Sequence, residues 1–166
     1  MKDFLKYFLT VANIDADNVR VGIVIYSTKV SIQFQMNRYI GDKVGLYRAI
    51  DRIPYQYGST NTFGGLNTMR TQMFTRATGD RPDVDNVAIV ITDGVSNINA
   101  RRTIPEAEMA RHQGIHIYAI GIGLTDTTEL DGIASRPIED NRFAVQDFND
   151  LKLLRDKVFS SFCQGN

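Results

Sequence analysis

The sequence predicts an α/β domain with a doubly wound, mainly parallel β-sheet. Three apolar runs rich in β-branched residues alternate along the chain with segments of helical periodicity. Runs without polar alternation are typical of parallel strands that helices cover on both faces. With 166 residues, the chain also has the length of one domain of ordinary size. We therefore expect a single domain over residues 1–166.

The composition is that of a globular protein, with 43% hydrophobic residues, 23% charged residues and no low-complexity tract. Nineteen basic and nineteen acidic residues give a formal net charge of zero, so no long-range field would attract nucleic acid or an anionic membrane. No apolar run approaches the ~20 residues of a membrane span, and no signal-peptide pattern is visible. We expect partners to be recognised locally, with no nucleic acid and no membrane insertion.

The first third of the chain predicts two helices and a hairpin. Apolar residues recur at helical spacing over residues 1–12, which predicts an amphipathic helix. The unbroken apolar run 21–26 is expected to be a strand buried on both faces. After a turn, the alternating segment 30–34 predicts an antiparallel edge strand. Residues 44–53 predict a short helix that ends before Pro54.

The remainder predicts helices and strands in alternation. A loop rich in Gly, Ser, Thr and Asn comes first, at residues 55–65. The expected helices are residues 65–77, 104–114, 127–135 and 149–162. The expected strands are residues 86–92, 115–123 and 141–146. Pro105 suits the first turn of its helix, and Asp126 with Glu129 fits a capping box at the start of the next one.

Polar residues follow the predicted strands at the edge where open parallel sheets bind ligands. Asp93 comes directly after the run 86–92. Its carboxylate therefore either binds a ligand or metal ion, or caps the next turn. Thr60 and Thr62 precede a predicted helix, and each is either a ligand-binding hydroxyl or a helix cap. An acid and a hydroxyl at one edge suit a hard ion such as Mg²⁺, which two groups alone would bind poorly.

Five segments resemble, in order and spacing, the von Willebrand factor type A (VWA) domain: GSTNTFGGL, VAIVITDGVS, EAEMARHQGIHIYAIGIG, ELDGIASRP and NRFAVQDFNDLKLLRDKVFSSFC. The ELDGIAS segment and the cysteine after the last helix are most similar to matrilins and fibril-associated collagens. The resemblance implies a Rossmann-like fold and a non-enzymatic, secreted module of the extracellular matrix or of cell adhesion. It also implies a protein partner from the matrix or cell surface, such as a collagen.

The resemblance further implies a metal ion-dependent adhesion site. In that family the ion is held by an aspartate and two serines of a DxSxS motif after the first strand, a threonine, and the aspartate of a TDG turn. The threonine corresponds to Thr60 and the last aspartate to Asp93. No DxSxS motif occurs in this sequence, and the family places it one strand ahead of the first predicted helix.

We therefore expect an N-terminally truncated VWA-like domain that lacks its central first strand and three of the metal ligands. Binding of Mg²⁺, or of another divalent cation, is expected in a complete parent domain and expected to be weak or absent in this chain. The single cysteine, Cys163, either pairs in the family manner with a cysteine ahead of the missing strand or is a free thiol. Two other functions stay open: an intracellular subunit of a complex with this fold, and a metal-assisted hydrolase.

Overall fold

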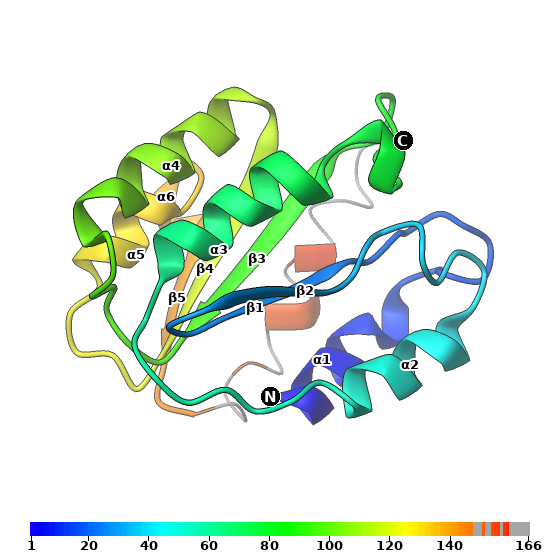
Figure 1. Ribbon diagram of the computed structural model, residues 1–166, viewed down its shortest axis with the longest axis horizontal. Coiled ribbons are helices and arrows are strands. Elements are labelled where there is room, and N and C mark those ends of the chain that lie inside the picture. The colour runs from blue at the N-terminus through cyan, green and yellow to red at the C-terminus, as the bar shows by residue number, and fades with distance from the viewer. Residues whose placement is uncertain (148–150, 152–153, 157, 160–166) are drawn as a thin grey trace.

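The computed structural model describes residues 1–147, 151, 154–156 and 158–159. In this part of the chain the strands form two separate sheets (Figure 1). The smaller sheet is an antiparallel hairpin of β1 (Ile23–Tyr26) and β2 (Val30–Phe34). The larger sheet is parallel and has the strand order β3-β4-β5. Its strands are β3 (Asn86–Thr92), β4 (Ile115–Ile122) and β5 (Arg142–Val145).

Helices cover both faces of these sheets. The α-helices are α1 (Lys2–Phe8), α2 (Lys43–Asp51), α3 (Thr62–Thr68), α4 (Ala100–His112), α5 (Thr128–Ile133) and α6 (Ile138–Asn141). Three further helical turns are η1 (Leu9–Val11), η2 (Met69–Met73) and η3 (Arg76–Thr78). None of the helices in the described ranges has the length and apolar content needed to cross a bilayer.

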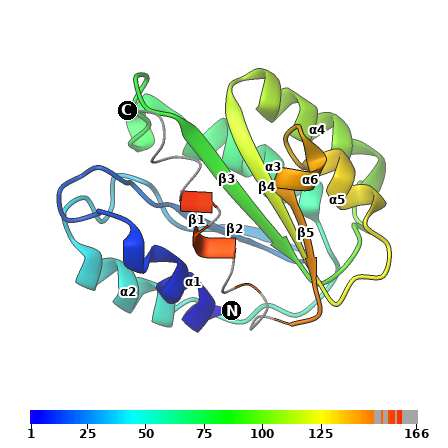
Figure 2. The ribbon, with the colours of Figure 1, turned by 180° about the vertical axis from the view of Figure 1, so that it is seen from behind.

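Two apolar clusters hold the layers together. In the first, α1 and α2 pack on one face of the sheets, and the buried Leu151, Leu154 and Val158 join them. Figure 2 shows this face, with the described C-terminal residues in red beside α1. In the second cluster, α3, α4 and α5 pack on the opposite face. Helices on both faces of a parallel sheet confirm the predicted Rossmann-like, doubly wound α/β fold.

The predicted strands agree with the structure in position. The segment 86–92 is β3, and the segment 30–34 is the antiparallel edge strand β2. The expectation that residues 21–26 are buried on both faces was wrong, because all four residues of β1 are only partly buried. The reason is that β1 pairs with β2 alone among the described strands, so its other edge has no neighbouring strand.

Two helices begin earlier than predicted. The helix α3 begins at Thr62 rather than Gly65, because the Asn61 side chain accepts a hydrogen bond from the Gly64 N–H at 2.9 Å and caps it. The helix α4 begins at Ala100, so Pro105 lies inside it rather than in its first turn. Of the predicted helix 149–162, residues 154–156 and 158–159 are described as helical. Cys163 and its pairing lie outside the described residues.

A buried ion pair joins η2 to α4. The Arg70 Nε donates a hydrogen bond of 2.6 Å to Glu106 Oε1, and Asn67 Nδ2 donates a weaker one of 3.3 Å to the same oxygen. The Glu106 side chain is 2% exposed. Because a buried carboxylate is costly without a cationic partner, this pair fixes how the two helices pack.

We expect Arg70→Ala to lower the free energy of unfolding by about 3 kcal/mol, because it leaves the Glu106 carboxylate buried without its cation. Urea unfolding followed by circular dichroism measures the change. Arg142→Ala is the matched control, since Arg142 binds Asp131 at 2.8 Å with both side chains about one-third exposed, and it should cost less than about 1 kcal/mol. An equal loss of unfolding free energy in the two variants would show that the buried Arg70–Glu106 pair contributes no more than an exposed pair.

Candidate functional site

Thr60 lies where the loop before α3 meets the turn after β3. Its N–H donates to Asn97 Oδ1 at 2.9 Å, and the Asn97 N–H donates to the Thr60 carbonyl at 3.0 Å. The Ile98 N–H donates to the same carbonyl at 3.3 Å. A Cβ atom on Gly94 would lie 3.0 Å from Thr60 Oγ1. The Thr60 hydroxyl therefore lies against the turn that begins with Asp93.

Asp93 is exposed at the carboxyl end of β3. The turn that follows is held by Thr92, whose Oγ1 donates to the Gly94 carbonyl at 2.7 Å and accepts from the Gly94 N–H at 3.2 Å. The capping role considered for Asp93 thus falls to the preceding residue. The structure brings Asp93 and Thr60 to the same edge of the sheet, as the spacing of their segments predicted.

The two threonines before α3 differ in environment. Thr60 is half-buried at the edge, whereas Thr62 is fully buried. Thr62 Oγ1 has no hydrogen-bond partner among the described residues. Neither threonine caps α3, because Asn61 does so. Burial of Thr62 leaves Thr60 as the threonine hydroxyl that lies at this edge.

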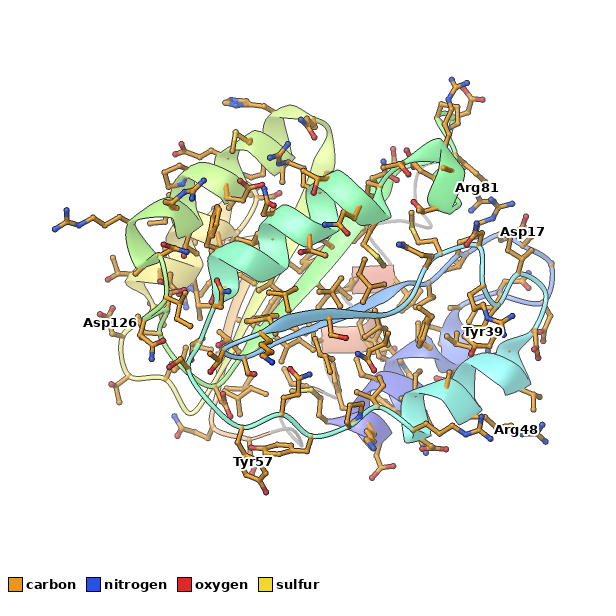
Figure 3. All side chains as sticks on the ribbon, viewed as in Figure 1. Asp17, Tyr39, Arg48, Tyr57, Arg81 and Asp126 are labelled. Atoms are coloured by element: carbon orange, nitrogen blue, oxygen red, sulfur yellow. The ribbon has the colours of Figure 1, made fainter. Side chains whose placement is uncertain are left out.

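Glu129 reaches this edge from α5, a role that the sequence did not reveal. Its Oε1 accepts a hydrogen bond of 3.0 Å from the Ser96 N–H and so holds the turn after β3. The predicted capping box was wrong, because the N-cap of α5 is Thr127 and its side chain forms no capping hydrogen bond. Asp126 Oδ1 instead accepts from the Thr128 N–H at 2.9 Å, and the Glu129 carboxylate binds the Ser96 amide. Figure 3 labels Asp126 beside this end of the sheet.

Tyr26 is a second residue that the sequence analysis missed. Its hydroxyl donates to the Ile91 carbonyl at 3.0 Å and so links β1 to β3. Burial raises the pKa of the Tyr26 phenol, and the nearby Glu129 and Asp93 carboxylates act in the same direction. The hydroxyl therefore stays protonated and serves as a hydrogen-bond donor.

An open depression lies next to this edge, at the turn between β1 and β2. It is lined by Ser27, Thr28, Lys29, Gln56 and Tyr57. The Tyr57 side chain, labelled in Figure 3, is 85% exposed. Tyr55, which is 74% exposed, packs edge-on against it with 4.4 Å between the ring centroids. Exposed aromatic side chains with a polar tip are typical anchors for protein partners.

The residues at the edge fit only part of a metal shell. In the described ranges, no three His, Cys, Asp or Glu side chains lie close enough to hold a metal ion. Thr60 and Asp93 offer two oxygen ligands, whereas Mg²⁺ requires about six, several of which are usually water.

The fold and its polar edge define the class of doubly wound α/β domains that bind ligands at the carboxyl ends of their strands. Within that class, the chain belongs to the VWA family. The family model described as the von Willebrand factor type A domain matches residues 1–157.

Relatives among well-described proteins come from the extracellular matrix. The chain is 34% identical to the collagen alpha-4(VI) chain of Mus musculus over 165 residues, which cover 99% of this chain and 7% of that one. It is 33% identical to matrilin-3 of Mus musculus over 168 residues, which cover 98% of this chain and 34% of that one. The chain thus spans a minor part of these relatives' length.

Solved structures that are similar to this chain also include a matrix protein. Proximal thread matrix protein 1 from the mussel byssus, in its second crystal form, superposes with a TM-score of 0.86 at 29% identity. The match covers 95% of this chain and 41% of that one. The structure of the same mussel protein with a zinc-occupied MIDAS motif superposes with a TM-score of 0.85 at 30% identity, with the same coverage.

We expect Asn97→Ala to accelerate hydrogen exchange at the Thr60 amide, because Asn97 Oδ1 accepts its hydrogen bond. The free energy of unfolding should fall by about 1 kcal/mol. Asn37→Ala is the control: Asn37 Nδ2 donates to the Ala77 carbonyl at 3.2 Å, away from this edge. Unchanged exchange at Thr60 in Asn97→Ala would show that the two loops are held together by other contacts.

Proposed function

We propose that the chain is a non-enzymatic protein-binding module of the extracellular matrix or of cell adhesion. The observation that carries this proposal is the VWA match over residues 1–157, together with relatives that are collagen VI chains and matrilins. Its partner is a matrix or cell-surface protein such as a collagen, and its location is extracellular. The exposed tyrosines and the depression beside the carboxyl edge supply a surface on which such a partner can bind.

We also propose that the metal ion-dependent adhesion site is incomplete in these 166 residues. Thr60 and Asp93 are its ligands here, and no DxSxS motif is present to complete the shell. When bound, a divalent ion would offer a coordination position to an acidic side chain of the partner. Asp93 would hold the ion with its carboxylate, and Thr60 with its hydroxyl.

This proposal predicts weak or absent Mg²⁺ binding, because two protein oxygen ligands leave most of the ion's shell to water. Isothermal titration calorimetry should give a dissociation constant of about 1 mM or weaker. A micromolar dissociation constant would contradict it. In a form of the protein that carries a DxSxS motif, Asp93→Ala should abolish metal-dependent adhesion. Asp83→Ala, an exposed aspartate ahead of the opposite end of β3, should leave it intact.

The binding surface is tested with immobilised collagens and matrilins, and with serum albumin as the negative surface. We expect Tyr57→Ala to weaken binding of the chain to its matrix partner at least about tenfold, as loss of an aromatic anchor does. Val44→Ala is the control, because Val44 is 62% exposed but lies on α2, away from the depression. Equal binding to albumin and to every matrix protein would overturn the proposed function.

A further inference from the structure

Tyr55 and Tyr57 form a pair of exposed tyrosines in the loop before α3. The sequence has seven tyrosines, and these two are 74% and 85% exposed, whereas the other five are buried or partly buried. Aromatic pairs usually lie about 4.5–7 Å apart. Here the ring centroids are 4.4 Å apart and the ring planes meet at 71°, so the two rings are in direct contact.

The backbone of this loop is anchored so that both rings face solvent. Gln56, which lies between the tyrosines, is half-buried, and its Oε1 accepts a hydrogen bond of 3.3 Å from Ser27 Oγ. The Ser59 N–H donates to Thr28 Oγ1 at 3.0 Å. Gly58 has a positive φ of 136°, and a Cβ atom there would clash with the Thr28 hydroxyl. These contacts hold the loop on the turn between β1 and β2 and leave the tyrosine side chains on its outer side (Figure 3).

The two phenols of the pair are also chemically accessible. Neither the Tyr55 nor the Tyr57 hydroxyl forms a hydrogen bond with another described residue. In contrast, the Tyr26 and Tyr47 hydroxyls donate to backbone carbonyls at 3.0 and 3.1 Å, and the partly buried Tyr39 packs on a phenylalanine ring. An oxidant can therefore reach both rings of the pair, and solvent can accept both of their protons.

We propose that Tyr55 and Tyr57 are a site of oxidative cross-linking, which a haem peroxidase with hydrogen peroxide converts into an intrachain dityrosine. The peroxidase removes one electron from each phenol, and each hydroxyl proton passes to solvent. The two tyrosyl radicals form a carbon–carbon bond between ring carbons ortho to the hydroxyls. Each ortho hydrogen then moves to the oxygen of its own ring, which restores both phenols. The two electrons and two protons reduce one hydrogen peroxide to two water molecules.

The ring contact favours coupling within one chain. Groups that are held together in one molecule react as if they were far more concentrated than separate molecules in solution. Coupling between two copies instead requires two radicals to meet by diffusion. The cross-link then restrains the loop that leads to Thr60 and α3.

Peptide mapping tests the proposal on the 166-residue chain. The chain is treated with a haem peroxidase and hydrogen peroxide and then digested with trypsin, which leaves both tyrosines in the peptide of residues 53–70. We expect dityrosine fluorescence and a peptide mass that is lower by two hydrogen atoms. The yield should stay constant when the chain is diluted about tenfold before oxidation. A covalent dimer of this peptide as the main product, or a yield that falls in proportion to the dilution, would overturn the proposal.

Single variants locate the cross-link. Tyr55→Phe and Tyr57→Phe each remove one phenol, so we expect at least about tenfold less dityrosine from either variant. Both should fold normally, because neither hydroxyl binds another described residue. Tyr39→Phe is the control: Tyr39 is partly buried and its ring contacts Phe34 at 5.1 Å between centroids, so the yield should be unchanged. An undiminished yield in Tyr57→Phe, or an equal loss in Tyr39→Phe, would overturn the proposal.

Discussion

The parallel pairing of β4 with β3 on one side and β5 on the other is the interaction on which the rest of the structure depends. Within the described residues, β4 is the one strand with a neighbour at both edges. Its side chains alternate between the two apolar clusters, with Ile117 and Ala119 on the face of α4 and Tyr118 and Ile120 on the face of α1. Both helical layers therefore pack on the same strand, and the turns that follow its neighbours meet at one edge.

Much of the fold could be predicted because its strands have strong local signals. The run 86–92 is apolar, rich in β-branched residues and bounded by turn signals, and it is β3 in the structure. The start of α3 was misplaced because Asn61 caps it in a loop with several possible capping residues. The partial burial of β1 could not be predicted at all, because it depends on which strands lie beside β1 rather than on its own residues.

The residues of the candidate site could be predicted only where a polar side chain lies next to the end of a recognisable helix or strand. Thr60 stands out because its hydroxyl precedes a recognisable helix, and Asp93 because its carboxylate follows a recognisable strand. Both positions lie at the edge where open parallel sheets bind ligands. Asn97 and Glu129 could not be found in this way. Each acts through a backbone amide far away in sequence, 37 residues away at Thr60 and 33 at Ser96. Such contacts arise from the packing of loops, for which a single sequence carries no periodic signal.

Among the described strands, β1 and β3 each have one edge without a neighbouring strand, and such edges can serve as templates for association between copies of a protein. With a pI near 6.7 and no net charge, two copies repel each other least close to neutral pH. With little charge repulsion, colloidal stability requires that these strand edges do not pair with the edges of other copies to form intermolecular sheets. Their short lengths, four and seven residues, and the two helical layers that flank them restrict such growth. The geometry that leaves these edges without a neighbouring described strand therefore also limits the formation of intermolecular sheets.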